Sequence, residues 1–270
     1  MPGNRVRGEM NELLERINET SCRLLGFNAS QDFTARIETV DMHCHLDFAD
    51  DACAIAREAQ RYGIAFFSGT VTPEGYEHAS MLLSDCKNVR VGLGFHPWWI
   101  TEASLAAPKE EGSSLEHFIG LAGQTSYVNE IGLDFSPRFS ETKEVQVEVL
   151  KVILSCVCEG AVLSLHSVKA TDVVLDLLEG AELFSSNSCI FHWFSGSNNE
   201  LHRAIKSGCY FSVGERFLSS KRGQEYLKVI PVNQLLFETD LPAQEHSNTT
   251  FEELRSSLWS AQDLLLKKSN

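Results

Sequence analysis

The chain has 270 residues, an apolar fraction of 43% and a formal net charge of −14 at pH 7. Its length suffices for one large α/β barrel or two small domains. An acidic chain without a basic stripe repels nucleic acid at long range, so a polyanionic substrate would need local groups or bound metal ions to attract it. Eight cysteines without a C-x-x-C pair exclude a disulfide scaffold. A charged N-terminus and the lack of a long apolar run predict a cytoplasmic protein with no signal peptide and no membrane span.

The first 34 residues stand apart from the pattern that follows. Their apolar side chains recur at helical spacing, which predicts an amphipathic helix from about residue 9 to 25 carrying Leu13, Leu14, Ile17, Cys22, Leu24 and Leu25. We expect residues 1–34 to form an N-terminal helical extension whose apolar face docks on a main domain at 35–270. A helix that binds a partner or a second copy is the alternative.

From Ile37 onward, strand-like runs alternate with helical segments. The predicted strands are 37–43, 64–70, 89–94, 126–131, 161–166, 188–193, 209–213 and 234–238. The predicted helices lie near 51–62, 74–87, 113–122, 142–159, 168–180, 197–207, 220–229 and 251–268. Eight β-then-α units predict an α/β protein of the (β/α)8 TIM-barrel type. A doubly wound open sheet is less favoured, because no G-x-G-x-x-G follows the first strand.

Histidines and carboxylates gather where the predicted strands end. His43 and His45 are two residues apart on the first strand, so both imidazoles can reach one point. In a barrel, functional side chains collect at the C-terminal ends of the strands. The strand ends supply four histidines and two carboxylates, which can bind one or two divalent ions: His43, His45, Glu130, His166, His192 and Asp240.

The motifs D-x-H-C-H-L-D, G-x-H-P, N-E-I-G-L-D, L-H-S, F-H-W-F-S-G and E-T-D-L-P occur in this order between Thr39 and Pro242. As a set they resemble the TatD-type metal-dependent hydrolases, a deoxyribonuclease family related to the amidohydrolase barrels. The resemblance implies two divalent ions (Zn, Mn or Mg) and a metal-activated water that cleaves a phosphodiester bond. His43, His45 and Asp240 would hold the first ion, and His166 and His192 would complete the second site. Glu130 would bridge the ions, and Asp240 would accept or orient the proton of the water, so these two are the expected catalytic residues.

The chain departs from the family in the residues expected to face the substrate. Val168 and Lys169 stand where many relatives have an arginine after H-S, and Trp98 and Trp99 follow Pro97 where relatives have a second histidine. We expect His96, Trp98, Lys169 and Trp193 to contact the substrate. A histidine fixed by the Pro97 turn and a plain hydrophobic cluster of tryptophans are the alternatives.

These features favour a divalent-metal-dependent hydrolase that acts on DNA or a nucleotide. The alternatives are a hydrolase of a small phosphoester, amide or lactone, and a metal-binding barrel that serves as an interaction scaffold. The sequence leaves the metal, the substrate and the oligomeric state open.

Overall fold

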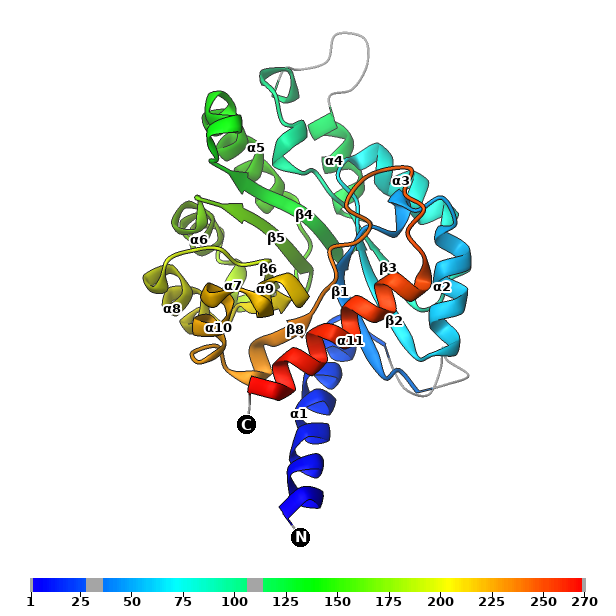
Figure 1. The fold of residues 1–270 in the computed structure, drawn as a ribbon. Helices are drawn as coiled ribbons and strands as arrows, with labels where there is room; N and C mark the ends of the chain where they lie inside the picture. Colours follow the sequence, from blue (N-terminus) through cyan, green and yellow to red (C-terminus); the bar gives the residue numbers. More distant parts are fainter. Residues whose placement is uncertain (1, 28–35, 106–113, 269–270) are drawn as a thin grey trace. The chain divides into compact units, whose positions relative to one another are not determined.

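The computed structural model describes residues 2–27, 36–105 and 114–268, drawn in colour in Figure 1. The chain falls into two compact units. Unit 1 comprises Met1–Phe67, Cys86–Val89 and Phe211–Asn270, and unit 2 comprises Ser68–Asp85 and Arg90–Tyr210. The predicted domain boundary at residue 34 lies in the segment 28–35, outside the described residues.

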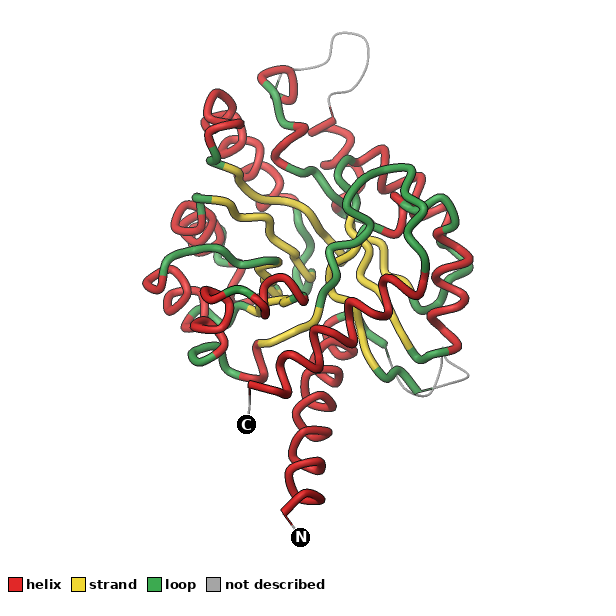
Figure 2. Tube along the Cα trace, in the orientation of Figure 1, coloured by secondary structure: helices red, strands yellow, loops and turns green. Residues whose placement is uncertain are grey.

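Eight strands alternate with helices along the chain, as predicted (Figure 2). The strands are β1 (Thr39–Cys44), β2 (Ile64–Gly69), β3 (Val89–Gly92), β4 (Tyr127–Asp134), β5 (Val162–Val168), β6 (Ser188–His192), β7 (Tyr210–Val213) and β8 (Leu235–Phe237). Each coincides with one of the predicted strands to within a few residues. The pairs β4–β5, β5–β6 and β7–β8 are parallel, as in an α/β protein.

The helices also confirm the predicted alternation. They are α1 (Pro2–Leu24), α2 (Ala52–Arg61), α3 (Pro73–Leu82), α4 (Ser114–Ala122), α5 (Lys143–Cys156), α6 (Thr171–Gly180), α8 (Asn198–Lys206), α10 (Lys221–Leu227) and α11 (Phe251–Lys268). Two short helices, α7 (Leu183–Ser186) and α9 (Glu215–Ser219), were not predicted. Among the described residues, no helix is both long and apolar enough to cross a membrane.

In unit 1, helices α1 and α11 both flank β8 (Figure 1). Helix α1 also packs on β1, with Ile17, Leu24 and Leu25 buried. The apolar face of the N-terminal helix thus docks on the strands of its own unit, as expected. Backbone hydrogen bonds join the ends of β1 and β8, since Asp240 N donates to His43 O (2.9 Å) and His45 N donates to Leu241 O (2.9 Å).

In unit 2, β4 lies beside β5, and Leu93 links the end of β3 to β4 through hydrogen bonds with Tyr127 and Asn129. Gly132 of β4 has a φ of +143°, and a Cβ there would lie 1.9 Å from His166 O. A side chain cannot fit, so glycine permits the close approach of β4 and β5 that brings their polar residues together.

Candidate functional site

The polar strand ends of unit 1 bring together His43, His45 and Asp240. Asp240 Oδ1 lies 3.7 Å from His43 Nε2 and 3.5 Å from His45 Nε2. Both imidazoles are buried, whereas the Asp240 side chain keeps 29% of its surface exposed. The two rings stand nearly perpendicular at a centroid distance of 5.2 Å, and His45 stacks on Phe48. We call these three residues the β1–β8 cluster.

A buried carboxylate below this cluster fixes its geometry. Asp41 accepts hydrogen bonds from Thr239 Oγ1 (2.6 Å), Thr239 N (3.0 Å) and His43 N (3.2 Å). Burial raises the pKa of Asp41 to about 7, although these hydrogen bonds act in the opposite direction. Asp41 therefore ties β1 to the residue before Asp240 and sets the spacing of the histidines and the carboxylate.

In unit 2, one carboxylate oxygen faces three imidazoles. Glu130 Oε2 lies 3.4 Å from His192 Nε2, 3.6 Å from His96 Nε2 and 3.9 Å from His166 Nδ1. All four side chains are buried. Glu130 comes from β4, His166 from β5, His192 from the end of β6, and His96 from the loop after β3. We call this group the β4–β6 cluster.

The backbone is strained where these residues project. Glu130 has a φ of +54° inside β4, at an irregularity in the register between Val128 and Ile131. Asp240, Lys169 and Trp193 also have left-handed φ values, each just beyond a strand. Non-glycine residues rarely adopt this conformation, and such strain concentrates at functional sites. Among the described residues, four of the six non-glycine residues with left-handed φ thus lie inside or just beyond strands that carry the clusters.

Asp134 supports the β4–β6 cluster from the end of β4. Its carboxylate accepts hydrogen bonds from Trp98 Nε1 (2.7 Å) and Ser136 N (2.8 Å), and Oδ2 lies 3.6 Å from His166 Nε2. Burial raises the pKa of Asp134, but interactions with His166, Trp98 and Ser136 outweigh it and hold the pKa well below its ordinary value. An ionised Asp134 favours a proton on His166 Nε2 and leaves the lone pair of Nδ1 facing Glu130.

The tautomer of His96 gives it a different role. Its Nδ1 accepts a hydrogen bond from the backbone N–H of Trp98 (3.1 Å), so in the neutral ring the proton lies on Nε2. That N–H points to the Glu130 carboxylate at 3.6 Å and cannot ligate a metal. His96 is therefore suited to donate a hydrogen bond, and its contact with a substrate stays a prediction. The backbone of the Pro97 turn also fixes the His96 ring through this hydrogen bond.

Apart from His96, the residues of both clusters fit divalent metal ions. Nitrogen–oxygen separations of 3.4 to 3.9 Å exceed those of hydrogen bonds. They are near the spacing of about 3.4 Å expected for two ligands of one tetrahedral ion with bonds of about 2.1 Å. The buried His166 ring presents the lone pair of Nδ1 to Glu130 Oε2 at 3.9 Å, where an ion would join the two groups. Neutral imidazoles and carboxylates are the donors that Zn and Mn accept.

The other expected substrate residues lie at the surface. Trp98 and Trp99 are each 45% exposed, and Trp193 is half-buried directly after β6. Lys169 is exposed directly after β5 and forms no hydrogen bond or ion pair with the residues that the structure describes. Of the four expected substrate residues, His96 belongs to the β4–β6 cluster, and Trp98 contacts it through Asp134 and the His96 ring. Substrate contact by Lys169 and Trp193 stays a prediction.

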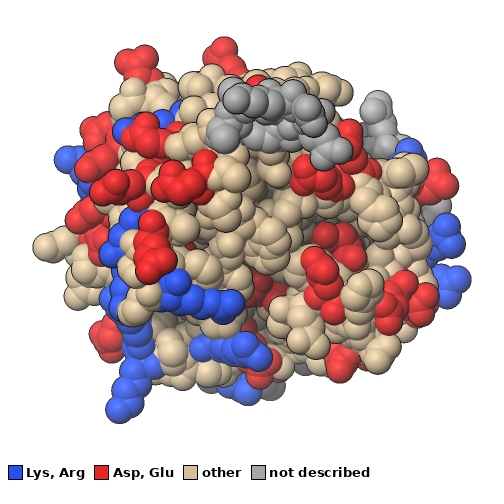
Figure 3. All heavy atoms as spheres, turned by 90° about the horizontal axis from the view of Figure 1, so that it is seen from above, with Lys and Arg blue, Asp and Glu red and all other residues tan. Residues whose placement is uncertain are grey.

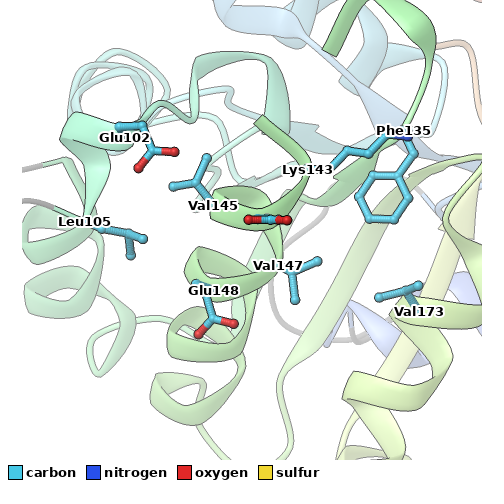
Figure 4. A pocket seen from close by; sticks show the side chains of 9 residues that line it. Glu102, Leu105, Phe135, Lys143, Val145, Val147, Glu148 and Val173 are labelled. Atoms are coloured by element: carbon cyan, nitrogen blue, oxygen red, sulfur yellow. The ribbon is translucent and has the colours of Figure 1, made fainter. Parts of the chain in front are cut away.

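Unit 2 also has a groove of about 560 Å³ on its surface (Figure 4). Its lining comprises Glu102, Leu105, Phe135, Lys143, Glu144, Val145, Val147, Glu148 and Val173. Several of these belong to α5, and the lining includes three carboxylates and one lysine, Lys143, which lies over the Phe135 ring. None of the described residues that line it belongs to the β4–β6 cluster, so the groove is separate from the candidate metal ligands.

Sequence reasoning did not assign roles to Asp41 and Asp134. Both lie inside the quoted motifs, in D-x-H-C-H-L-D and N-E-I-G-L-D. A signal for them was present, because an aspartate in an otherwise apolar strand needs hydrogen-bond donors when it is buried. Their partners, Thr239 and Trp98, are 198 and 36 residues away in sequence.

Comparison with protein families finds one model that matches most of the chain. The model described as TatD related DNase matches residues 40–258. Deoxyribonuclease TATDN3 of Homo sapiens is 28% identical over 227 residues, which cover 77% of this chain and 80% of that protein. The 3'-5' ssDNA/RNA exonuclease TatD of Erwinia amylovora is 26% identical over 205 residues, covering 72% of this chain and 75% of that protein.

Solved structures agree on the fold. The TATD homologue YJJV from Escherichia coli has a TM-score of 0.60 at 21% identity, covering 85% of this chain and 94% of its own. A TatD family hydrolase from Entamoeba histolytica has a TM-score of 0.64 at 16% identity, covering 90% of this chain and 98% of its own. These likenesses confirm the predicted TIM-type α/β class.

Proposed function

We propose that this chain, which belongs to the family of TatD-related DNases, is a divalent-metal-dependent hydrolase of phosphodiester bonds. The observation that carries the proposal is the β4–β6 cluster, in which a buried glutamate faces three histidines and one of these is backed by Asp134. A carboxylate–histidine pair behind a ligand is typical of metal sites.

Two divalent ions complete the proposed site. His43, His45 and Asp240 would hold one ion, and Glu130, His166 and His192 would hold the other. Mixed nitrogen and oxygen ligation suits Zn or Mn better than Mg. When bound, such ions lower the pKa of a coordinated water and offset the charge that builds on a phosphate during hydrolysis.

The chain's own residues would then divide the remaining work. Asp240 keeps part of its carboxylate exposed, so it can accept a proton from a water at the surface of its cluster. Glu130 is buried, and its negative charge would offset the positive charge of the bound ion. His96, with its proton on Nε2, can donate a hydrogen bond to a phosphate oxygen or to the leaving oxygen.

The relatives named as deoxyribonuclease and ssDNA/RNA exonuclease support nucleic acid as the substrate class. Acidic side chains are spread over the face shown in Figure 3, and basic ones lie mainly on the left and in the lower middle of the view, with a few at the right edge. Such a surface disfavours long duplexes, whose binding depends on many phosphate contacts. We therefore favour short or terminal segments of nucleic acid.

We further propose that residues 35–270 form the hydrolase domain and residues 1–34 its helical extension. None of the eight cysteines, all within the described residues, forms a disulfide, which fits the reducing conditions of the cytoplasm.

Cleavage of a labelled single-stranded oligonucleotide tests the function directly. Metal-stripped protein would be supplied with Mg, Mn or Zn, and the wild type compared with Asp240→Asn and His192→Ala. His202→Ala is a matched control, because His202 is an exposed histidine of α8. We expect cleavage that requires metal, is lost in the first two variants and is kept in the control. Equal cleavage by all variants would exclude the assignment.

A further inference from the structure

Three aromatic rings form a row beside the β4–β6 cluster in unit 2. Phe139 and Trp98 stack at a centroid distance of 5.4 Å and an interplanar angle of 17°. Trp98 and Trp99 follow at 6.3 Å and 14°. The three rings are thus almost parallel and offset from one another, and Trp98 and Trp99 each keep 45% of their surface exposed. We call Phe139, Trp98 and Trp99 the aromatic row.

The row is held rigidly to the candidate metal ligands. Trp98 Nε1 donates to Asp134, whose other neighbour is His166. The edge of His96 meets Trp98 at 4.8 Å and Trp99 at 5.6 Å. The Trp98 ring centroid lies 6.2 Å from that of His166. The aromatic row is therefore held directly beside the β4–β6 cluster.

An arginine completes the row. The guanidinium of Arg138 lies 5.6 Å from the Trp98 ring and 5.2 Å from the Phe139 ring. Arg138 itself is exposed, and no carboxylate of the described residues forms an ion pair with it. It follows Pro137 in the turn after β4, so its position derives from the same strand that carries Glu130 and Asp134.

Large exposed aromatic rings that lie side by side, here next to an arginine, mark a surface where a ligand binds. Nucleic-acid sites combine these two features, because a base stacks on an aromatic face while a cation contacts the backbone. Arginine suits this role, since its planar group stacks on rings and can bind a phosphate in bidentate fashion. The family's arginine after H-S is absent from this chain, where Val168 stands, so Arg138 offers a cation from a different strand end.

We propose that the aromatic row and Arg138 form a stacking platform for the base of the nucleotide next to the scissile phosphate. Phe139, Trp99 and Arg138 are then specificity-determining residues, and the enzyme acts better on a nucleotide that carries a base than on one that lacks it. This inference rests on the proposed hydrolysis of nucleic acid.

The test compares a single-stranded oligonucleotide with copies that have an abasic residue at the 3′ or the 5′ terminal position. For the wild type we expect kcat/KM to fall roughly fivefold to a hundredfold on one abasic copy, the range of base–aromatic stacking. In Phe139→Ala, Trp99→Ala and Arg138→Ala this difference should shrink to less than about twofold, with the loss mostly in KM for the natural substrate. A merely structural role would slow the natural and the abasic substrates equally.

Two further variants separate stacking from support of the cluster. Trp98→Phe removes the donor to Asp134 but keeps a stacking ring. Because the ring is kept, this variant should preserve the preference for a base. Trp259→Ala is a matched control, because Trp259 is 41% exposed and lies under Arg255 at 5.9 Å, in α11 of unit 1. The control should retain the full preference.

Equilibrium binding of the same oligonucleotides, followed by fluorescence anisotropy, does not depend on turnover. If the wild type fails to cleave any oligonucleotide with any metal, the proposed function fails, while weaker binding of an abasic copy would still support the platform. Equal binding and equal cleavage of natural and abasic oligonucleotides by the wild type would overturn the platform and leave the hydrolase intact.

Discussion

The substitution Asp134→Asn tests whether Asp134 tunes a metal ligand. The wild-type carboxylate accepts from Trp98 Nε1 at 2.7 Å and lies 3.6 Å from His166 Nε2. Asparagine can still accept from one donor, but its amide places N–H groups opposite the N–H of Trp98 or of His166. Without the negative charge, His166 Nδ1 is a weaker ligand and its tautomer is no longer fixed. Loss of such a partner costs about 10- to 100-fold in metal affinity, or about 1.4 to 2.7 kcal/mol.

The assay is competition for Mn or Zn between the protein and a chromophoric chelator at pH 7. Asp263→Asn is a charge-matched control, because Asp263 is an exposed residue of α11. We expect the lowered affinity in Asp134→Asn and wild-type affinity in the control, with both variants folded by circular dichroism. A change of less than twofold in a folded Asp134→Asn would refute the role assigned to Asp134.

The low pKa of Asp134 also makes the free energy of unfolding depend on pH. Because its pKa in the folded protein lies below the value of about 3.9 in the unfolded chain, ionised Asp134 stabilises the fold above about pH 4. This contribution is lost as the pH falls toward the folded pKa. The difference in unfolding free energy between the wild type and Asp134→Asn should therefore be constant near neutral pH and shrink in acid, and a difference that grew in acid would contradict it.

Three further predictions concern the fold around the clusters. Because the pKa of Asp41 is raised to about 7, its contribution to stability is present in acid and is lost as the pH rises from about 4 to 7. The free energy of unfolding of metal-stripped protein, measured in urea, should therefore fall with pH over this range by at most about 1.4 kcal/mol per pH unit. Asp41→Asn should abolish this pH dependence, and an unchanged dependence would contradict the role of Asp41. Gly132→Ala should lower the free energy of unfolding by more than about 3 kcal/mol, because its Cβ would meet the backbone of β5. The control Gly120→Ala, on an open face of α4, should be neutral or slightly stabilising. Similar effects in both variants would refute the close approach of β4 and β5. Ile17→Ala should cost about 2 to 5 kcal/mol if docking of α1 stabilises unit 1, and a loss no larger than that of exposed Glu19→Ala would show that it does not.

The order and type of the elements follow from sequence periodicity. All eight predicted strands are present, because a buried parallel strand requires a continuous apolar run that is visible locally, as in Ile64–Gly69. Short helices such as Glu215–Ser219 escaped prediction, since five residues contain too little periodicity to detect.

The candidate site was predictable in its residue types and less so in its geometry. The histidines and carboxylates could be found because they end strands. The left-handed backbone of Glu130 could not, because strain arises from tertiary packing and leaves no local sequence signal for a glutamate. The proton on His96 Nε2 and the stacking of Arg138 on Trp98 also depend on contacts that form only in the folded chain.

The most direct test of the central claim is a metal titration that follows cleavage and metal content in the same sample. Metal-stripped protein would receive Mn in steps while hydrolysis of a single-stranded oligonucleotide and bound Mn are both measured. We predict that activity rises with occupancy, reaches a plateau near two ions per chain, and is absent from His192→Ala at every step. Cleavage by the metal-stripped protein, or full Mn occupancy without any cleavage, would contradict a metal-dependent phosphodiesterase.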